Sequence, residues 1–249
     1  MGDSELRKVL LVVQYDGTDY FGFQRQPGLP TVQSELERAL SQLLDERTTI
    51  AASGRTDAGV HAVGQTVTFT TRSPIPTGRI VNALNALLPD EISAIEASVV
   101  PADFHPRYSA TGKLYGYRIL NRLLPSPFIG RYAWHLTWEL DIALMGEAAG
   151  VLLGEHDFAA FSSSGSSVEN TVRELRRLDI EPQGDLIEIR AEANGFLYMM
   201  VRRIVGTLTD VGRGLISVEE VGEILRSLDR TRVRTMAPPQ GLSLIKVTY

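Results

Sequence analysis

The sequence has no cysteine, which excludes disulfide bonds and metal sites built from thiolates. No apolar run approaches the roughly 20 residues that cross a bilayer, and residues 1–8 lead into a strand and not into a signal peptide. Histidine is scarce, and its positions lack the spacing of metal ligands: His61, His105, His135 and His156. We therefore expect a folded cytoplasmic protein without a metal, whose stability comes from packing over one large or two modest domains.

Lysine is nearly absent, and the net charge is -5. An acidic total argues against a nucleic-acid partner because phosphate binding is largely electrostatic, but the total does not set the sign of one face. Arginine, which suits bidentate phosphate contacts and stacking on bases, gathers in the second half of the chain. The arginines that could line one face are Arg173, Arg176, Arg177, Arg202, Arg203, Arg213, Arg230, Arg232 and Arg234. The alternative is surface ion pairing with the equally plentiful glutamates.

Apolar periodicity predicts two α+β halves with helices packed against a sheet. In the first half we expect strands over 8–16, near Thr49, and over 65–71 and 92–100, with helices over 32–45 and 78–87. In the second half we expect strands over 113–121, 132–138, 173–181, 186–193 and 242–247, with helices over 142–153, 197–212 and 218–227. Thr31 to Ser34 supplies an N-cap and a start like a capping box, with Ser34 followed three residues later by Glu37. We place the domain boundary near Ser109, which gives domains 1–108 and 109–249.

The most informative segment runs from Ser53 to Ala62 and sets one carboxylate, Asp57, between two glycines and beside Arg55. A short β-prone stretch precedes it and an alternating pattern follows it, which predicts a tight loop between two extended segments. Such a loop lets a ligand approach the backbone closely, and this suits an acid that touches a substrate atom. Alternatively, Asp57 makes an Asx-type turn and only bonds its own backbone.

Three further motifs accompany this loop. The first comprises residues 14–26 and the start of the next helix at 31–37, the second comprises residues 104–110 and 113–117, and the third is residues 195–206. Together they resemble the tRNA pseudouridine synthase A family along nearly the whole chain. Two departures are Pro106, where the family usually has a small residue, and Ser34, which replaces a common glycine. The resemblance implies two ferredoxin-like (RRM-like) halves. Their sheets would join into one extended, mainly antiparallel sheet with helices on one side and a central active-site cleft.

The resemblance also implies the reaction, which is the isomerisation of uridine to pseudouridine at positions 38 to 40 of the tRNA anticodon stem-loop. The bond between uracil N1 and ribose C1′ breaks and the base rejoins through C5, so no redox cofactor and no metal is needed. An ionised carboxylate handles the electron-deficient ribose, as a nucleophile or as a fixed counter-charge. The resemblance marks Asp57 as that group, by direct attack on C1′ or through a glycal route. It further implies a homodimer that holds tRNA across both subunits, with no DNA or membrane partner.

Arg202 is the expected partner of this carboxylate. Desolvation raises the pKa of a carboxyl group unless a cation or hydrogen bonds oppose it, and the family pairs its aspartate with an arginine at this position. The helix that carries Arg202 is otherwise largely apolar, so its charge is expected to be buried and to need a partner. Alternatively, Arg202 reaches the surface and its neighbour Arg203 faces inward.

Three more residues receive roles from the resemblance. Tyr115, on the same strand face as Tyr117, would stack on the target uracil and take the C5 proton, although a phenol with a pKa near 10 needs help to act as a base. Arg55 would hold the everted nucleotide, and Leu242 would pack under the base. From the residues alone, the tyrosines and Leu242 fit core positions equally well, and Arg55 fits a brace that bonds to loop carbonyls.

Two other classes of protein remain open at this point. An N-glycoside hydrolase would use the same carboxylate but also needs a second acid that activates water, and no motif beside Asp57 supplies one. A non-catalytic RNA-binding protein would use the aromatic residues on its sheets. The polar segment Ser162–Ser167 is explained by turn chemistry, and in a nucleic-acid enzyme it could also close over RNA.

Overall fold

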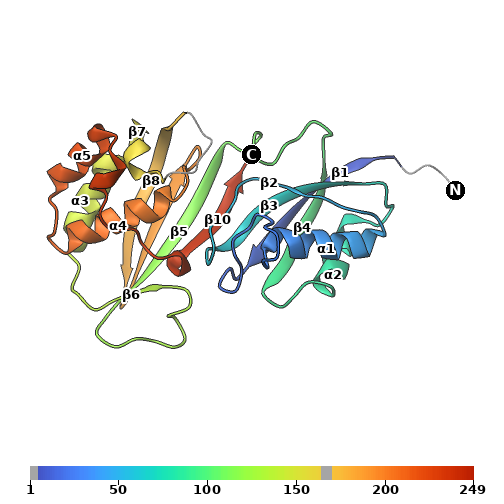
Figure 1. The fold of residues 1–249 in the computed structure, drawn as a ribbon, viewed down its shortest axis with the longest axis horizontal. Coiled ribbons are helices and arrows are strands. Elements are labelled where there is room, and N and C mark those ends of the chain that lie inside the picture. The colour runs from blue at the N-terminus through green and yellow to red at the C-terminus, as the bar shows by residue number, and fades with distance from the viewer. Residues whose placement is uncertain (1–4, 164–169) are drawn as a thin grey trace. The chain divides into compact units, whose positions relative to one another are not determined.

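The computed structural model describes residues 5–163 and 170–249, and the chain forms two compact units (Figure 1). The first unit holds the residues up to Ala110 together with Leu244–Tyr249, and the second holds Thr111–Ser243. Strand β10 (Leu242–Thr248) therefore belongs mostly to the first unit, although it ends the sequence. The domain boundary near Ser109 remains a prediction. Most of the segment expected to close over RNA, residues 164–167, lies outside the described residues.

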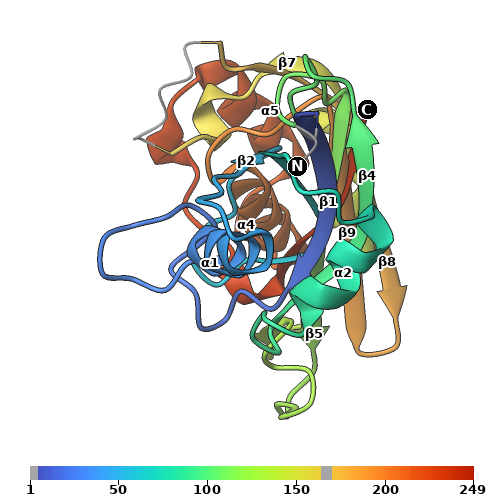
Figure 2. The same ribbon diagram turned by 90° about the vertical axis from the view of Figure 1, so that its right-hand side faces the viewer.

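The first unit has the strand order β4-β1-β3-β10. Strand β1 (Arg7–Tyr15) is antiparallel to both β3 (His61–Thr71) and β4 (Ile92–Val100), and the two-residue β2 (Ala51–Ala52) pairs with β3. Every second residue of β1 is buried, as expected of a strand with one face in a core. Helix α1 (Val32–Leu44) lies to one side of β1 (Figure 2) and contacts α2 (Thr77–Asn85), which packs on β4.

The start of α1 corrects one detail of the sequence analysis. Thr31 is the N-cap, and its hydroxyl oxygen accepts a hydrogen bond from the Ser34 N–H while Ser34 Oγ accepts one from the Thr31 N–H. The capping box therefore pairs Thr31 with Ser34. Glu37, one turn further on, is buried and its carboxylate instead accepts the backbone N–H of Ile50 at 3.1 Å.

The second unit has the strand order β5-β9-β8-β7. Strands β5 (Gly112–Asn121), β9 (Leu186–Ala193), β8 (Val172–Gln183) and β7 (Gly154–Asp157) pair antiparallel in that order, and β6 (Trp134–Leu136) is parallel to β5. Helices α3 (Ile142–Leu152), α4 (Met200–Gly212) and α5 (Val218–Ser227) lie on one side of these strands (Figure 1). Short 3₁₀ turns lie at Ala159–Phe161, Arg230–Arg232 and Pro239–Gly241.

The α+β class and the mainly antiparallel pairing are confirmed within each unit. The joining of the two sheets and the cleft between the halves remain predictions. Helix α4 starts at Met200 and not at 197, because Met199 adopts a left-handed conformation with φ 61° that breaks the helical run. Strand β7 was not predicted, since its four residues are too few and too polar to show alternation.

Candidate active site

The structure places Asp57 on the loop between β2 and β3. The Ser53 N–H donates to the Thr66 carbonyl at 2.9 Å, which extends the β2–β3 ladder by one residue before the chain leaves the sheet. The loop closes where the Val60 N–H donates to the Asp57 carbonyl at 3.1 Å, beside Gly59 with φ 75°. Asp57 is half-buried and Arg55 is exposed. This is the tight loop between extended segments that the sequence predicts.

A second segment of the first unit lies directly against this loop. The Phe23 N–H donates to the Thr56 carbonyl at 3.0 Å. A Cβ atom on Gly17 would stand 2.1 Å from the Val60 carbonyl oxygen, and one on Gly22, whose φ is 88°, would stand 2.9 Å from the Thr56 carbonyl oxygen. Glycine is therefore required at both positions for the two backbones to approach this closely.

A buried polar cluster supports the loop from within the first unit. Gln65 Oε1 accepts the Ser53 hydroxyl at 2.7 Å, and Gln65 Nε2 donates to the Gly54 carbonyl at 3.1 Å. The Tyr15 hydroxyl lies 2.8 Å from Thr56 Oγ1. Burial raises the pKa of Tyr15 to about 12, so its phenol stays protonated at neutral pH. Sequence reasoning missed this cluster; its signal was a glutamine in the same alternating register as Val67 and Phe69.

His61 fixes the other end of the loop. Its Nδ1 accepts the Gly17 N–H at 3.1 Å and lies 3.1 Å from Asp16 Oδ1. His61 is 4% exposed. These contacts give this histidine a structural role.

Tyr115 lies on β5 in the second unit, opposite Ala191 of β9. Its ring is half-buried and meets Phe196 edge to face, with ring centroids 5.2 Å apart. Tyr117, two residues on, is fully buried and donates its hydroxyl proton to the Pro238 carbonyl at 2.8 Å. Burial raises the pKa of Tyr117 well above its ordinary range. Tyr117 is thus a core aromatic, whereas Tyr115 keeps part of its ring accessible.

Arg202 is buried on α4, and its Nε–H donates to the Ala237 carbonyl at 2.8 Å. The Ala237 N–H in turn donates to the Arg202 carbonyl at 3.0 Å. The segment before Pro238 therefore lies along α4, and Gly206 permits this because its Cβ would stand 2.1 Å from the Thr235 carbonyl oxygen. The neighbouring Arg203 is half-buried and bonds the carbonyls of Ala160 and Arg230. The alternative in which Arg202 reaches the surface is wrong.

Leu242 begins β10 and is buried. The preceding Gly241 packs against the Tyr117 ring, because a Cβ there would stand 2.6 Å from Tyr117 Cζ. This placement agrees with a core role for Leu242. Its proposed position under a target base remains a prediction.

Several arginines of the second unit form ion pairs within that unit. Arg176 pairs with Glu174 at 2.8 Å, and Arg232 pairs with Glu223 at 3.1 Å. Arg177 pairs with Asp179. Arg213 instead lies over the Trp138 ring, with Cζ 3.9 Å from the centroid. Surface ion pairing therefore describes Arg176, Arg177 and Arg232.

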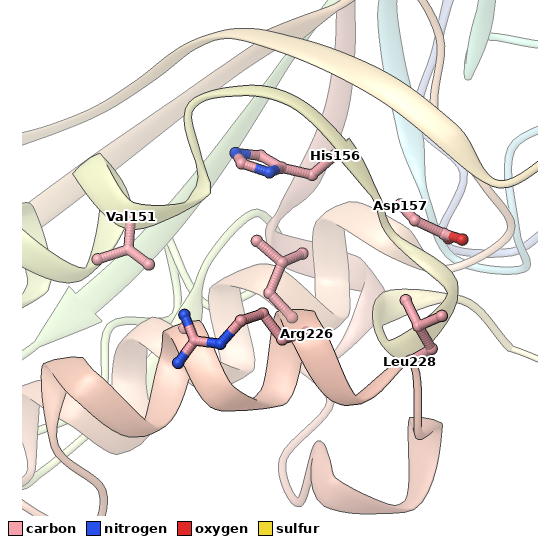
Figure 3. Close-up of a pocket in the computed structure, with 7 residues that line it drawn as sticks. Val151, His156, Asp157, Arg226 and Leu228 are labelled. Carbon is pink, nitrogen blue, oxygen red and sulfur yellow. The ribbon is translucent and has the colours of Figure 1, made fainter.

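A pocket of about 360 Å³ opens in the second unit between α3, β7 and α5 (Figure 3). Its lining residues are Val151, His156, Asp157, Gly222, Leu225, Arg226 and Leu228. The His156 ring nitrogen Nε2 lies 2.8 Å from the Leu153 carbonyl oxygen. In Figure 3 the Asp157 carboxylate points away from His156 and Arg226. None of the residues expected at the active site lines this pocket.

The described residues hold neither a metal-binding cluster nor a membrane-spanning helix. Across residues 5–163 and 170–249, no group of three or more histidine and acidic side chains is placed to hold a metal ion. No helix in those same ranges has the length and apolar character that a membrane crossing requires.

Comparison with known proteins identifies the class to which this fold and site correspond. The family model described as tRNA pseudouridine synthase matches residues 11–109 and 148–249, which include Asp57 and Arg202. The chain belongs to this family of isomerases that act on tRNA. It is 48% identical over 244 residues to the tRNA pseudouridine synthase A of Thermoanaerobacter sp. (strain X514), covering 98% of this chain and 100% of that protein. The tRNA pseudouridine synthase A of Acetivibrio thermocellus is 43% identical with the same coverage.

Proposed function

We propose that this protein converts uridine to pseudouridine at positions 38 to 40 of the tRNA anticodon stem-loop, with Asp57 as the nucleophile. The observation that carries the proposal is the half-buried Asp57 on a loop whose flanking residues are bonded to a buried polar cluster. A carboxylate that attacks a sugar carbon must be held at a fixed distance and angle, which a loop bonded on both sides provides.

The reaction leaves the composition of the nucleotide unchanged. The N1–C1′ bond breaks and its electron pair stays on N1, while the Asp57 carboxylate bonds or faces C1′. The detached uracil turns, C5 bonds C1′, and any ester bond to Asp57 is released in that step. C5 then loses its proton and N1 gains one. We propose that Arg202 keeps Asp57 ionised. Because its Nε–H already bonds the Ala237 carbonyl, this pairing would use the terminal guanidinium nitrogens.

Tyr115, Arg55 and Leu242 complete the proposed site. The half-buried Tyr115 ring stacks on the target uracil and its hydroxyl takes the C5 proton. The exposed Arg55 holds the everted nucleotide, since a guanidinium partly offsets the lost stacking, and Leu242 packs beneath the base. Tyr115→Phe separates the two roles of the tyrosine, because phenylalanine still stacks but has no hydroxyl.

The test uses transcribed tRNA that carries tritium at C5 of its uridines. Incubation with the purified protein is expected to release tritium, and mapping is expected to find pseudouridine at positions 38 to 40 only. A transcript with cytidine at those positions is the control and is expected to release none. Pseudouridine at other positions would overturn the site assignment. Release of free uracil would indicate an N-glycoside hydrolase, and tRNA binding without tritium release would indicate a non-catalytic RNA-binding protein.

The homodimer and action in the cytoplasm belong to the same proposal and rest on the family resemblance. Sedimentation analysis at assay concentration is expected to show a dimer. A fully active monomer would contradict a substrate held across two subunits.

A further inference from the structure

The loop that carries Asp57 has almost no regular structure of its own. Strand β2 contributes only two residues, and the ladder ends at the Ser53 N–H bond to the Thr66 carbonyl. Between that bond and the start of β3 at His61, the shape of the loop depends on contacts with residues from elsewhere in the first unit.

Gln65 makes several of those contacts with one side chain. Its Oε1 accepts the Ser53 hydroxyl at 2.7 Å and the Thr66 N–H at 3.1 Å. Its Nε2 donates to the Gly54 carbonyl at 3.1 Å and to the Tyr15 hydroxyl at 3.5 Å. An amide side chain has two acceptor sites and two donor hydrogens, so all four are used and only one orientation of the amide fits.

The position of Gln65 is one where the strand would ordinarily place an apolar residue. Gln65, Val67 and Phe69 lie on the same face of β3, and Gln65 pairs with Val13 of β1. Gln65 is 0% exposed. A buried amide is unfavourable unless its hydrogen bonds are made, so it stabilises only the one loop conformation that makes them.

Tyr15 acts on the residue directly before Asp57. Its hydroxyl lies 2.8 Å from Thr56 Oγ1, and the Thr56 carbonyl also accepts the Phe23 N–H at 3.0 Å. The β1–β3 register shifts between Val13 and Tyr15, which brings Tyr15 opposite Ala62. The Tyr15 hydroxyl also accepts a hydrogen bond from Gln65 Nε2, so the two side chains support the loop together.

We propose that Gln65 and Tyr15 are positioning residues for Asp57: Gln65 holds Ser53 and Gly54 before it, and Tyr15 holds Thr56 beside it. This inference rests on the proposed function for its effect on turnover. The hydrogen bonds that carry it lie wholly within the first unit. Neither side chain touches the substrate in this proposal; both act through the loop.

The experiment compares Gln65→Leu and Tyr15→Phe with the wild type at saturating tRNA. We expect kcat to fall by roughly 10- to 100-fold in Gln65→Leu and less in Tyr15→Phe, because a misplacement near 1 Å costs about that much. KM is expected to stay within about threefold, since phosphate contacts dominate tRNA binding. The matched control is Asn85→Leu, another side-chain amide with two backbone bonds, to Ala94, in the same unit. It is expected to lower the melting temperature and to leave kcat unchanged.

Amide hydrogen exchange over residues 53–60 gives a second measurement that does not depend on activity. Exchange there is expected to be at least about 10-fold faster in Gln65→Leu and unchanged in Asn85→Leu. Unchanged exchange, or faster exchange with a wild-type kcat, would overturn the proposal. If the wild type makes no pseudouridine, the proposed function fails, and the exchange data still decide whether Gln65 holds the loop. If Gln65→Leu does not fold, Tyr15→Phe decides by the same two measurements.

Discussion

The hydroxyl of Tyr15 lies 2.8 Å from Oγ1 of Thr56, the residue directly before Asp57. The two residues are 41 positions apart in the sequence, and the contact is buried. A strand in the core of the first unit is thereby bonded to the loop that carries the proposed nucleophile. Changes to buried groups of this unit are therefore expected to be measurable in turnover as well as in stability.

Asp57→Asn is expected to lower turnover by at least about 1,000-fold, because an amide neither attacks C1′ nor supplies a counter-charge. The dissociation constant for tRNA is expected to stay within about threefold, since phosphate contacts dominate binding. Tritium release and filter binding measure the two quantities. Asp90→Asn, a change at an exposed acid of the same unit, is the control and should behave as the wild type. Near-normal turnover in Asp57→Asn would remove the central assignment.

Arg202→Leu is expected to lower turnover and to reduce the free energy of unfolding by about 1–3 kcal/mol. It removes the donor to the buried Ala237 carbonyl, and an unsatisfied buried acceptor costs about that much. Arg203→Leu is the matched control. Arg203 also bonds carbonyl groups, so the control should lose stability and keep its turnover. Urea titration and tritium release decide the outcome, and equal losses of turnover in both variants would argue against a special role for Arg202.

Gly17→Ala is expected to destabilise the first unit by about 3 kcal/mol or more and to lower kcat. The new Cβ would stand 2.1 Å from the Val60 carbonyl oxygen, so the segment around Gly17 and the Asp57 loop must move apart. Gly28→Ala tests the effect of backbone strain alone. Gly28 has φ 74° with nothing within 4 Å of its Cβ position, and the change should cost about 1 kcal/mol with kcat unchanged. Thermal melts measure the loss of stability and initial rates measure kcat. Equal losses in the two variants would contradict the prediction.

Stability at high pH is expected to depend on Tyr15. Burial raises its pKa to about 12, above the ordinary value of 10.0, so between these values the unfolded chain loses a proton that the folded protein keeps. Protonated Tyr15 makes its full contribution to the free energy of unfolding at pH values below 10.0, its pKa in the unfolded chain. This contribution is lost as the pH rises through about 12, its pKa in the folded protein. The loss amounts to about 3 kcal/mol. Urea titrations between about pH 9 and 12 should show a shallower decline in Tyr15→Phe than in the wild type. Equal slopes in Tyr15→Phe and the wild type would show that Tyr15 does not contribute to the pH dependence of stability.

The Asp57 loop could be predicted because its determinants are local. Gly54 and Gly59 mark the turn, and the strand pattern after Gln65 marks where the chain rejoins the sheet. The buried state of Arg202 was also predictable, from the apolar character of the helix around it. These properties depend on neighbours within a few residues, which the sequence displays directly.

The partners of buried polar groups could not be predicted in this way. Glu37 is placed like a helix-start residue, yet its carboxylate accepts the Ile50 N–H and pairs with Arg25 at 2.8 Å. Gln65 reads as the first residue of a strand, yet its amide bonds Ser53 and Gly54. A hydrogen bond requires two atoms within about 3 Å at a suitable angle, and only the folded backbone brings together atoms this far apart in the sequence.

The sequence by itself determined the α+β class, the family and the loop on which Asp57 lies, because propensity, periodicity and motif order are properties of nearby residues. Only the tertiary structure decided which side chains hold that loop, that residues 244–249 pack with the first unit, and that Arg202 bonds Ala237. These outcomes depend on how distant segments pack. A buried polar group needs a hydrogen bond, and it bonds the partner that the folded chain brings within hydrogen-bonding distance.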